Sequence, residues 1–348
     1  MNYWQMAAGF EDRGYWKYFY KYGVACVGGK RNITRFLRDV AQDDILILKE
    51  GTTSIRAVGK VIVQPKMAKE SSLLKLSKDD LFYHFDGWLL PAYCVVEWKK
   101  PANPVHVKGL TRGTLCGVKN ETIKRTAQEI FDNTKPHEKE GLPKPTALIG
   151  DEELLRFLVQ EGLSAKTANE LKASIERTRL LANYYFHEYG DEKDGLSWGD
   201  LREHEIRSFL VIPFLQALGW SEQQLKIEFP VKSENTSTKR IDIACFDRPF
   251  TGSNKGPSII IETKSFGTGL ANASEQARRY AIQFTKCRAF IATNGTCYKL
   301  FPKREDGLFA DEPSAYLDLL RPRTKYPLDP SSCDGAKGVL NALLPKIR

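Results

Sequence analysis

Three charged residues lie in or directly after two apolar runs in the second half of the chain. Asp242 lies within Arg-Ile-Asp-Ile-Ala at 240–244, and Glu262 and Lys264 close the run Ile-Ile-Ile-Glu-Thr-Lys at 259–264. Strand interiors seldom contain charges, because an unpaired buried carboxylate is costly and needs a partner. Carboxylate oxygens are ligands for Mg²⁺, and a nearby lysine can orient or deprotonate an attacking water or stabilise developing phosphorane charge. The pattern therefore predicts metal-assisted hydrolysis of a phosphodiester.

The segments that must position these charges alternate between helical and strand patterns. Apolar periodicity and β-branched runs distinguish the two, and Asn294-Gly295 is a strong hairpin signal. From residue 197 onward we expect a helix at 201–218, strands at 225–229, 240–247 and 257–264, a helix at 271–285, a strand pair at 288–301 and a short helix at 336–344.

A set of short motifs occurs in the same order as these elements. They are Glu203-x-x-x-Arg207, Ile-Pro-Phe-Leu at 212–215, Leu-Gly-Trp at 218–220, Arg240-Ile-Asp242, Glu262-Thr-Lys264, Gln276-x-x-x-Tyr280 and Thr293-Asn294-Gly295. Taken together, they resemble the PD-(D/E)XK nuclease superfamily. Within it they look most like the nuclease domain at the N terminus of type I restriction R subunits. The resemblance covers about residues 198–302.

This resemblance implies a role for individual residues. Asp242 and Glu262 match the metal ligands, Lys264 matches the catalytic lysine, and Glu203 matches a helix glutamate that adds a carboxylate to the metal site. Gln276 matches a glutamine that lies near the scissile strand. The implied cofactor is Mg²⁺, with Mn²⁺ as a substitute.

Each of these residues also has a simpler interpretation. Asp242 and Glu262 fit a pair of exposed charges on an edge strand. Glu203 fits a carboxylate that favours the N-terminal end of a helix dipole. Glu205 competes with Glu203, because residues two apart on a helix face different directions. Gln276 fits a solvated helix residue.

The first part of the chain contains three runs of β-branched and aromatic residues, at 44–49, 55–63 and 92–98. Such runs favour strands. Together with Tyr-Trp near the start and Asp86-Gly-Trp, they resemble EVE-like domains of the PUA superfamily over about residues 1–110. Relatives of that fold hold a flipped, modified base in an aromatic pocket. The candidate pocket residues are Trp4, Trp16, Trp88 and Trp98, with packing in a β-barrel core as the alternative.

The expected fold class is therefore multidomain α+β and α/β. We predict a PUA/EVE-like mixed β-barrel at 1–110, a largely helical connector at 111–196 and a restriction-endonuclease-like α/β/α core at 197–348. Helical spacing within the connector predicts helices at 120–131, 154–163 and 165–186.

The amino-acid composition limits the kinds of partner and the cellular location that we expect for this protein. The net charge of +9 favours a polyanion, and 42% hydrophobic residues exclude a disordered chain. The seven cysteines form no CxxC pair, and no signal peptide or membrane-length apolar run occurs. We therefore expect reduced thiols, a cytoplasmic location and no membrane partner.

The favoured hypothesis is a modification-dependent restriction endonuclease that acts as a homodimer on double-stranded DNA carrying a modified base. Two alternatives remain open at this point. One is a nuclease effector triggered by a small nucleotide or a protein partner. The other is a non-catalytic nucleic-acid-binding subunit.

Overall fold

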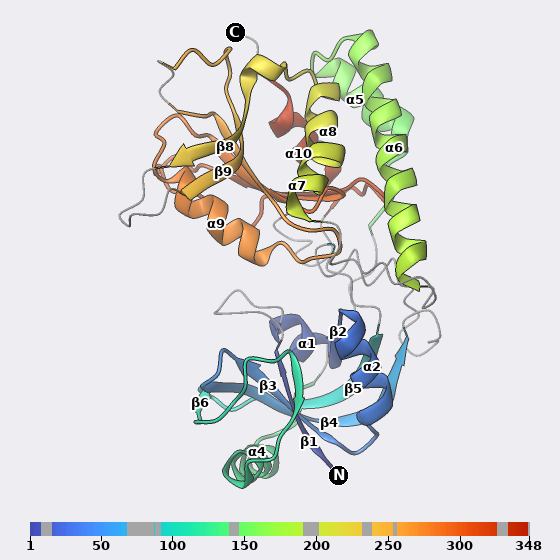
Figure 1. The fold of residues 1–348 in the computed structure, drawn as a ribbon, viewed down its shortest axis with the longest axis vertical. Coiled ribbons are helices and arrows are strands. Elements are labelled where there is room, and N and C mark those ends of the chain that lie inside the picture. Colours follow the sequence, from blue (N-terminus) through green and yellow to red (C-terminus); the bar gives the residue numbers. More distant parts are fainter. Residues whose placement is uncertain are drawn as a thin grey trace. The chain divides into compact units, whose positions relative to one another are not determined.

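The protein is described by a computed structural model covering residues 1–7, 16–67, 87, 92–138, 146–190, 202–231, 239–252, 256–325 and 333–346. The chain divides into two compact units. The first comprises residues 1–85 and 89–143, and the second comprises residues 86–88 and 144–348. Each unit is built on one mixed sheet that packs against helices, so the fold is mixed α/β (Figure 1).

The sheet of the first unit has the strand order β2-β5-β4-β3-β1-β7, with β6 paired to β4. The strands are β1 (Tyr3–Ala7), β2 (Val24–Val27), β3 (Ile45–Glu50), β4 (Ser54–Met67), β5 (Ala92–Lys99), β6 (Val105–His106) and β7 (Leu115–Gly117). The register of β4 with β5 shifts between Val61 and Val63 and again between Val63 and Lys66. Such irregularities bend a strand and increase its twist, which suits the curled sheet in Figure 1.

Two helices precede the first of the three strands that the sequence predicts. They are α1 (Trp16–Tyr22) and α2 (Lys30–Asp39). Helix α1 buries Trp16, Phe19 and Tyr22 on one face. Because aromatic side chains are also favoured in strands, composition alone did not reveal this helix. The strands expected at 44–49, 55–63 and 92–98 are confirmed as β3, β4 and β5.

The core of the first unit extends beyond residue 110. Ile45 and Val58 pack with Ile123 and Ile130 of helix α4 (Glu121–Asn133). The side chain of Asn120 caps this helix by accepting hydrogen bonds from its first free backbone N–H groups. Strand β7 pairs with β1 as well. The expected connector at 111–196 is thus divided, because β7 and α4 complete the first unit.

The rest of that segment packs into the second unit. Helices α5 (Asp151–Gln160) and α6 (Ala165–Gly190) contact each other. Arg179 of α6 forms a bidentate ion pair with Asp151, at 2.6 and 2.7 Å, and its Nε donates to the carbonyl of Leu319. These helices are therefore tied to the second unit by charge-assisted hydrogen bonds.

The second unit contains a sheet in the order β13-β12-β11-β10-β9-β8. Only β10 and β11 pair in parallel, and the other neighbours are antiparallel. The strands are β8 (Leu225–Val231), β9 (Lys239–Cys245), β10 (Ile259–Thr263), β11 (Ala289–Thr293), β12 (Cys297–Pro302) and β13 (Ala315–Asp318). The hairpin predicted at Asn294-Gly295 joins β11 to β12, whereas β13 was not anticipated from the sequence.

Helices cover both faces of this sheet. Phe301 and Tyr298 lie three positions apart on β12, so their side chains point to opposite faces. Phe301 packs in a cluster with Ala277 and Tyr280 of α9 (Ala271–Ala281). The Tyr298 ring lies 5.2 Å from the ring of Phe214 on the other side. The result is a sheet held between helical layers.

The layer opposite α9 includes an interrupted helix. The segment expected as one helix at 201–218 is α7 (Glu203–Ile206), a π-helical turn η4 (Arg207–Val211) and α8 (Ile212–Ala217). The remaining elements of this unit are the short turn η5 (Glu222–Gln224) and α10 (Ala336–Leu343). π-Helical turns are rare and often occur at functional sites. This one begins at Arg207, whose role is described below.

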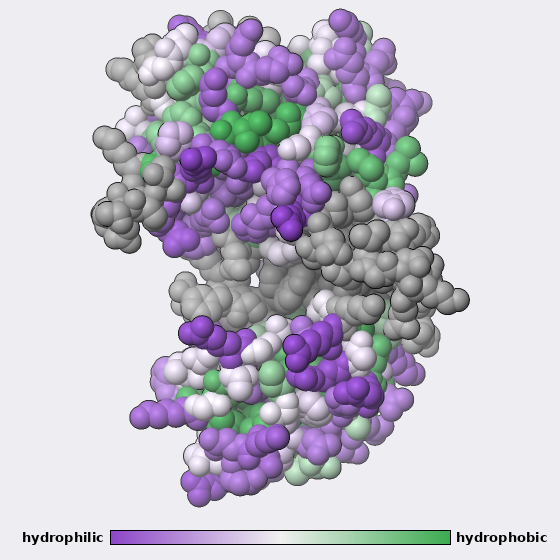
Figure 2. Space-filling model, viewed as in Figure 1, coloured by the Kyte–Doolittle hydropathy of each residue, from purple (hydrophilic) through white to green (hydrophobic). Residues whose placement is uncertain are grey.

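The visible surface of both units is mostly hydrophilic, with apolar side chains gathered in small patches (Figure 2). In the part of the chain that the structure describes, no helix combines the length and apolarity needed to cross a bilayer.

Candidate active site

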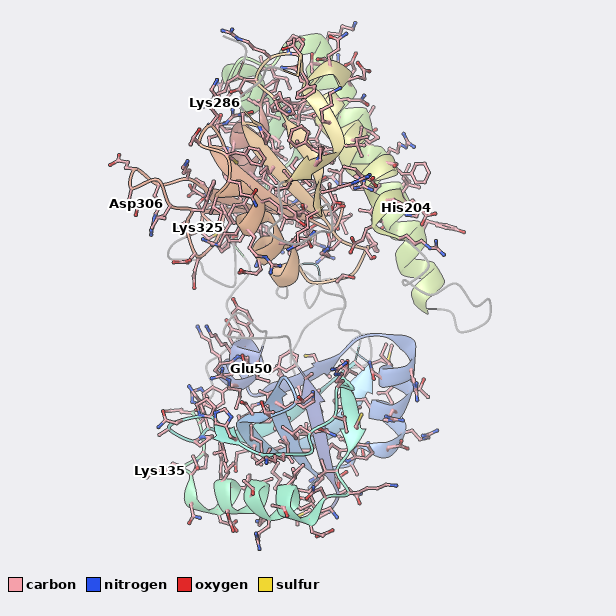
Figure 3. The ribbon with its side chains drawn as sticks, turned by 60° about the vertical axis from the view of Figure 1, so that its left-hand side comes forward. Glu50, Lys135, His204, Lys286, Asp306 and Lys325 are labelled. Atoms are coloured by element: carbon pink, nitrogen blue, oxygen red, sulfur yellow. The ribbon has the colours of Figure 1, made fainter. Side chains whose placement is uncertain are left out.

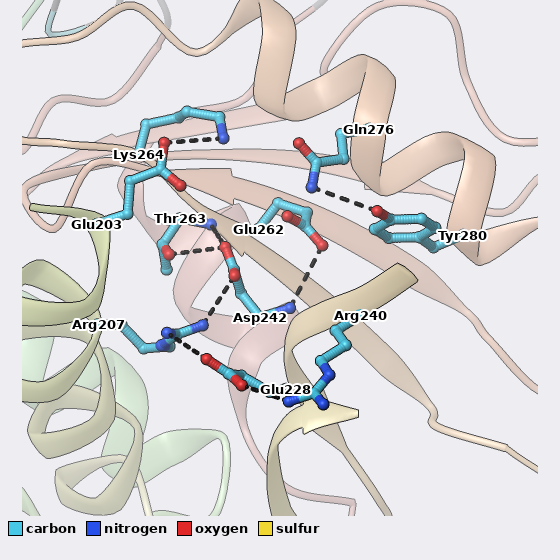
Figure 4. A network of polar contacts seen from close by, with 10 residues as sticks. All are labelled: Glu203, Arg207, Glu228, Arg240, Asp242, Glu262, Thr263, Lys264, Gln276 and Tyr280. Atoms are coloured by element: carbon cyan, nitrogen blue, oxygen red, sulfur yellow. Dashed lines mark hydrogen bonds and ion pairs between the residues drawn. The ribbon is translucent and has the colours of Figure 1, made fainter. Parts of the chain in front are cut away.

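Asp242 and Glu262 lie beside each other on adjacent strands. Strands β9 and β10 are paired up to Ile243 and Ile261, so the two acidic residues occupy the next position of the ladder. The backbone N–H of Asp242 donates to Oε1 of Glu262 at 3.4 Å. The strand pattern that singled out these residues therefore brings their carboxylates together (Figure 4).

Glu262 is the most deeply buried member of the pair, with no exposed surface. Burial, followed by the nearby charge of Asp242, raises the pKa of Glu262 to about 9. Its Oε2 atom is buried and has no hydrogen-bond partner within the described residues. A buried carboxylate oxygen of this kind needs either a proton or a cation. Asp242 beside it supplies a second hard oxygen donor, so the pair fits a divalent metal ion.

Asp242 is held by contacts to both of its oxygens. Its Oδ2 accepts hydrogen bonds from the backbone N–H and the hydroxyl of Thr263, each at 2.8 Å. Its Oδ1 accepts from Nη1 of Arg207 at 2.8 Å. These three donors fix the orientation of the Asp242 carboxylate.

Lys264 follows β10, and its backbone N–H donates to the carbonyl of Thr293 on β11. Its ammonium lies 3.1 Å from Oε1 of Glu203 on α7. Glu205 is used differently, since its side chain accepts from the backbone N–H of Arg202 and caps the helix. The structure thus distinguishes the two glutamates, and Glu203 is the one that faces Lys264.

Within the described ranges, no three His, Cys, Asp or Glu side chains are grouped for metal binding. Glu203 is therefore not preassembled with Asp242 and Glu262 as a third ligand, and its role at the metal stays a prediction.

Gln276 and Tyr280 lie one helical turn apart on α9, and Gln276 Nε2 donates to the Tyr280 hydroxyl at 3.4 Å. Burial raises the pKa of Tyr280, and the charge of Glu262 raises it further. Figure 4 shows both side chains directed toward Glu262. The amide predicted to lie near the scissile strand therefore borders the paired carboxylates.

The sequence assigns no role to three residues close to Asp242. Arg207 occurs in one of the motifs, Thr263 lies between Glu262 and Lys264, and Glu228 lies in the strand expected at 225–229. Arg207 is buried and donates to Glu228 at 3.3 Å as well as to Asp242. Its signal in the sequence is a charge beside the apolar run Phe-Leu-Val at 209–211. Glu228 carries no such signal, because its position depends on a backbone φ of 51°.

The tryptophans of the first unit occupy different surroundings. Trp98 is 1% exposed and donates its Nε1 to the carbonyl of Val24, so it is a core side chain. Trp4 is half-buried and donates to Asp44 at 3.0 Å. Trp88 lies outside the described residues.

Trp16 is buried, yet its Nε1 has no partner among the residues that the structure describes. The guanidinium of Arg56 lies 5.3 Å from its ring centroid and the ammonium of Lys100 lies 5.4 Å away. Arg56 is also paired with Glu50, which Figure 3 labels. Trp16 is thus a buried tryptophan flanked by two cations, with an indole N–H that no described residue accepts.

Comparison with known proteins gives one family match. Residues 202–310 match the family described as "Type I restriction enzyme R protein N terminus (HSDR_N)". This confirms the resemblance to the N terminus of type I restriction R subunits over strands β8 to β12 and helices α7, α8 and α9. None of the curated proteins matches the chain.

Two solved structures are similar to part of the chain. One is the YTH domain of Zygosaccharomyces rouxii MRB1 protein in complex with N6-methyladenosine RNA. It shows 11% identity and a TM-score of 0.27 over 39% of this chain and 89% of that one. The other is a mutant ZmASCH protein from Zymomonas mobilis. It shows 9% identity and a TM-score of 0.25 over 39% of this chain and 100% of that one.

Proposed function

We propose that the second unit is a metal-dependent endonuclease of a restriction system that hydrolyses phosphodiester bonds in double-stranded DNA. The observation that carries this proposal is the buried Oε2 of Glu262 beside Asp242, which has no partner among the described residues, with Lys264 directly after the strand that carries Glu262. The family match of residues 202–310 supports it independently.

Asp242 and Glu262 would hold Mg²⁺, with Mn²⁺ as a substitute, because both ions favour oxygen ligands. A bound cation supplies positive charge to a phosphate and lowers the pKa of a bound water. Within the chain, the backbone N–H and hydroxyl of Thr263 and the guanidinium of Arg207 hold Asp242 in place. This fixed geometry lowers the cost of reorganisation when charge develops on the phosphate.

The residue to which we assign direct action on the reacting groups is Lys264. Its ammonium carries three donors, one of which is directed to Glu203. The remaining donors can contact a phosphate oxygen as its charge increases, or orient the attacking water. Glu203 restrains the lysine, and Gln276 supplies an amide at the border of the site.

For the first unit we propose the reading of a modified base. Trp16 is the pocket residue that we favour, because an indole N–H without an acceptor among the described residues and two flanking cations suit a base attached to a phosphate backbone. Stacking against an aromatic ring offsets part of the cost of unstacking a base from the duplex. Since one site cuts one strand, we propose a homodimer on DNA and a role in defence against foreign DNA.

A cleavage assay tests the proposal. One duplex sequence is prepared unmodified and with 5-methylcytosine, 5-hydroxymethylcytosine or N6-methyladenine, and is incubated with Mg²⁺ or Mn²⁺. The control is Asp242→Asn, which keeps the shape of the side chain and a partner for Arg207 while removing the charge. We expect the wild-type protein to cut one modified duplex and Asp242→Asn to bind it without cutting.

The outcomes separate the two parts of the proposal. Equal cleavage of every duplex would keep the nuclease and remove the base reader. Equal cleavage by the wild-type protein and Asp242→Asn would remove the active-site assignment. DNA binding without cleavage of any duplex would favour a binding subunit.

A further inference from the structure

Three carboxylates occupy one row across three adjacent strands of the second unit. In β8 and β9, Ile227 pairs with Ile243 and Phe229 pairs with Ile241, so Glu228 lies at the position opposite Asp242. The same row continues to Glu262 on β10. Like charges on directly opposed strand positions repel each other, so such a row needs cations or protons to compensate it.

Arg207 supplies one cation, between the first two members of the row. Its Nη1 donates to Asp242 at 2.8 Å and its Nη2 to Glu228 at 3.3 Å, and the arginine side chain is only 9% exposed. Glu262, the third member, forms no ion pair with any residue that the structure describes, and its Oε2 lacks a partner there. Among the described residues, the negative charges of Glu228 and Asp242 are thus paired with an arginine, whereas Glu262 has no cation beside its buried Oε2.

Glu228 reaches Arg207 through an unusual backbone conformation. Its φ of 51° lies in the left-handed region, which residues other than glycine seldom adopt and which costs about 1–3 kcal/mol. Its other oxygen accepts from Arg240 at 2.8 Å. A strained backbone is stable only where other contacts offset its cost, and the contacts of Glu228 here are ion pairs with Arg207 and Arg240. We therefore infer that the charge of Glu228 has a role.

The contacts of Asp242 determine how a cation would meet Arg207. A carboxylate has about four lone-pair positions. Two donors from Thr263 use those of Oδ2, and Arg207 uses one of those on Oδ1. The lone pair left by the described residues is therefore on Oδ1, the same oxygen that Arg207 contacts. A divalent cation at Asp242 would share this oxygen with a guanidinium.

We propose that the positive charge of Arg207 lowers the affinity of Asp242 for a divalent cation. We propose also that the ion pair between Arg207 and Glu228 partly offsets this positive charge and so limits the loss of affinity. This inference rests on the proposed function, because it concerns the same metal site. Weak intrinsic affinity would make stable metal binding depend on the extra ligands that a DNA phosphate provides. Arg207 is thus a positioning residue that also tunes the site.

The test is calorimetric titration of Mn²⁺ into the full chain without DNA, at one pH and ionic strength. Because a neighbouring positive charge is removed, Arg207→Gln is expected to bind Mn²⁺ about tenfold more tightly than the wild-type protein. Glu228→Gln is expected to bind about threefold more weakly, a smaller effect because Glu228 is half-exposed. The double variant is expected to approach Arg207→Gln.

Arg240→Gln is the matched control, since Arg240 forms an ion pair with Glu228 and, among the described residues, none with Asp242. Its affinity is expected to stay close to that of the wild-type protein. Weaker binding by folded Arg207→Gln would show that the arginine only shapes Asp242 and would overturn the proposal. An equal increase in Mn²⁺ affinity in Arg240→Gln would overturn it as well, because the loss of any nearby positive charge would then explain the result.

Two further results keep the test decisive. If Arg207→Gln does not fold, as judged by circular dichroism, Glu228→Gln alone decides, and unchanged or tighter Mn²⁺ binding would contradict the proposal. If the wild-type protein binds no Mn²⁺ while its fold is intact, the proposed metal site itself fails, which differs from a wrong sign in the variants.

Discussion

The ammonium of Lys264 lies 3.1 Å from Oε1 of Glu203, so the lysine after β10 is held by a carboxylate from helix α7. The side chain of Lys264 is 14% exposed and that of Glu203 is 47% exposed. This pair spans two elements that meet only in the folded second unit. The ion pair predicts a role for Glu203 that acts through Lys264, in addition to its predicted role as a metal ligand.

The first prediction separates these two functions of Glu203. Lys264→Met is expected to lower single-turnover cleavage by about 10²–10⁴-fold, because the donor near the reacting groups is lost. Glu203→Gln is expected to lower the rate less and to leave Mn²⁺ affinity close to that of the wild-type protein. Calorimetry checks the second point. A loss of Mn²⁺ affinity as large as that of Glu262→Gln would show that Glu203 is a metal ligand.

The second prediction concerns the pH dependence of stability without metal. The pKa of Glu262 is about 9 in the folded protein, compared with an ordinary value of 4.5. Between these values the folded state keeps the proton and the unfolded state releases it. The contribution of Glu262 is therefore fully present below the ordinary value and is lost as pH rises toward 9, by up to about 1.4 kcal/mol per pH unit.

Urea unfolding in the presence of a chelator, at several pH values from 5 to 9, measures this effect. Glu262→Gln cannot titrate, so its free energy of unfolding should gain on that of the wild-type protein as pH rises. Parallel pH profiles for the two proteins would contradict the assignment. Saturating Mg²⁺ should reduce the difference, since it binds the ionised carboxylate of the wild-type protein.

The sequence was sufficient to predict the centre of this site. Asp242 and Glu262 interrupt apolar runs, and strands close together in sequence tend to be neighbours in a sheet. Their proximity therefore followed from local patterns. The contacts of Arg207 and Glu228 did not, because they depend on a π-helical turn and on one left-handed residue in a strand. Neither backbone feature leaves a residue pattern of its own.

The same limit applies to the first unit. Trp16 and Trp98 are identical residues in similarly aromatic surroundings. Among the described residues the indole N–H of Trp16 has no acceptor, whereas that of Trp98 donates to the carbonyl of Val24. Only the fold determines which carbonyl comes within reach of an indole. The division of residues 111–196 was hidden for a related reason. Helix α4 and helix α5 are both amphipathic, and the partner of an apolar face is a tertiary property.

The third prediction uses this contrast between tryptophans. Trp16→Leu should preserve folding but weaken binding of the modified duplex by about tenfold, because stacking on one base contributes about 1–3 kcal/mol. Trp98→Phe should instead lower the free energy of unfolding by about 1–3 kcal/mol, since the buried carbonyl of Val24 loses its donor. Fluorescence anisotropy and thermal unfolding measure the two effects. Unchanged DNA affinity in Trp16→Leu would place Trp16 in the core.

The fourth prediction concerns the hairpin between β11 and β12. Gly295 has a φ of 92°, and a Cβ atom there would lie 2.7 Å from Leu210 and 2.9 Å from Ile206. These two residues belong to η4 and α7, the segments that also carry Arg207 and Glu203. Gly295→Ala should therefore displace the helical segment that positions two residues of the candidate site.

Gly307→Ala provides the matched control. Gly307 has a comparable φ of 82°, but a Cβ atom there would meet no described atom within 4 Å, so only backbone strain is added. We expect Gly307→Ala to cost about 1 kcal/mol from strain and Gly295→Ala to cost about 1–3 kcal/mol more from overpacking. Because the clash bears on α7 and η4, Gly295→Ala should also slow cleavage, whereas Gly307→Ala should not. Equal loss of stability and activity in both variants would show that the hairpin does not support the site through this contact.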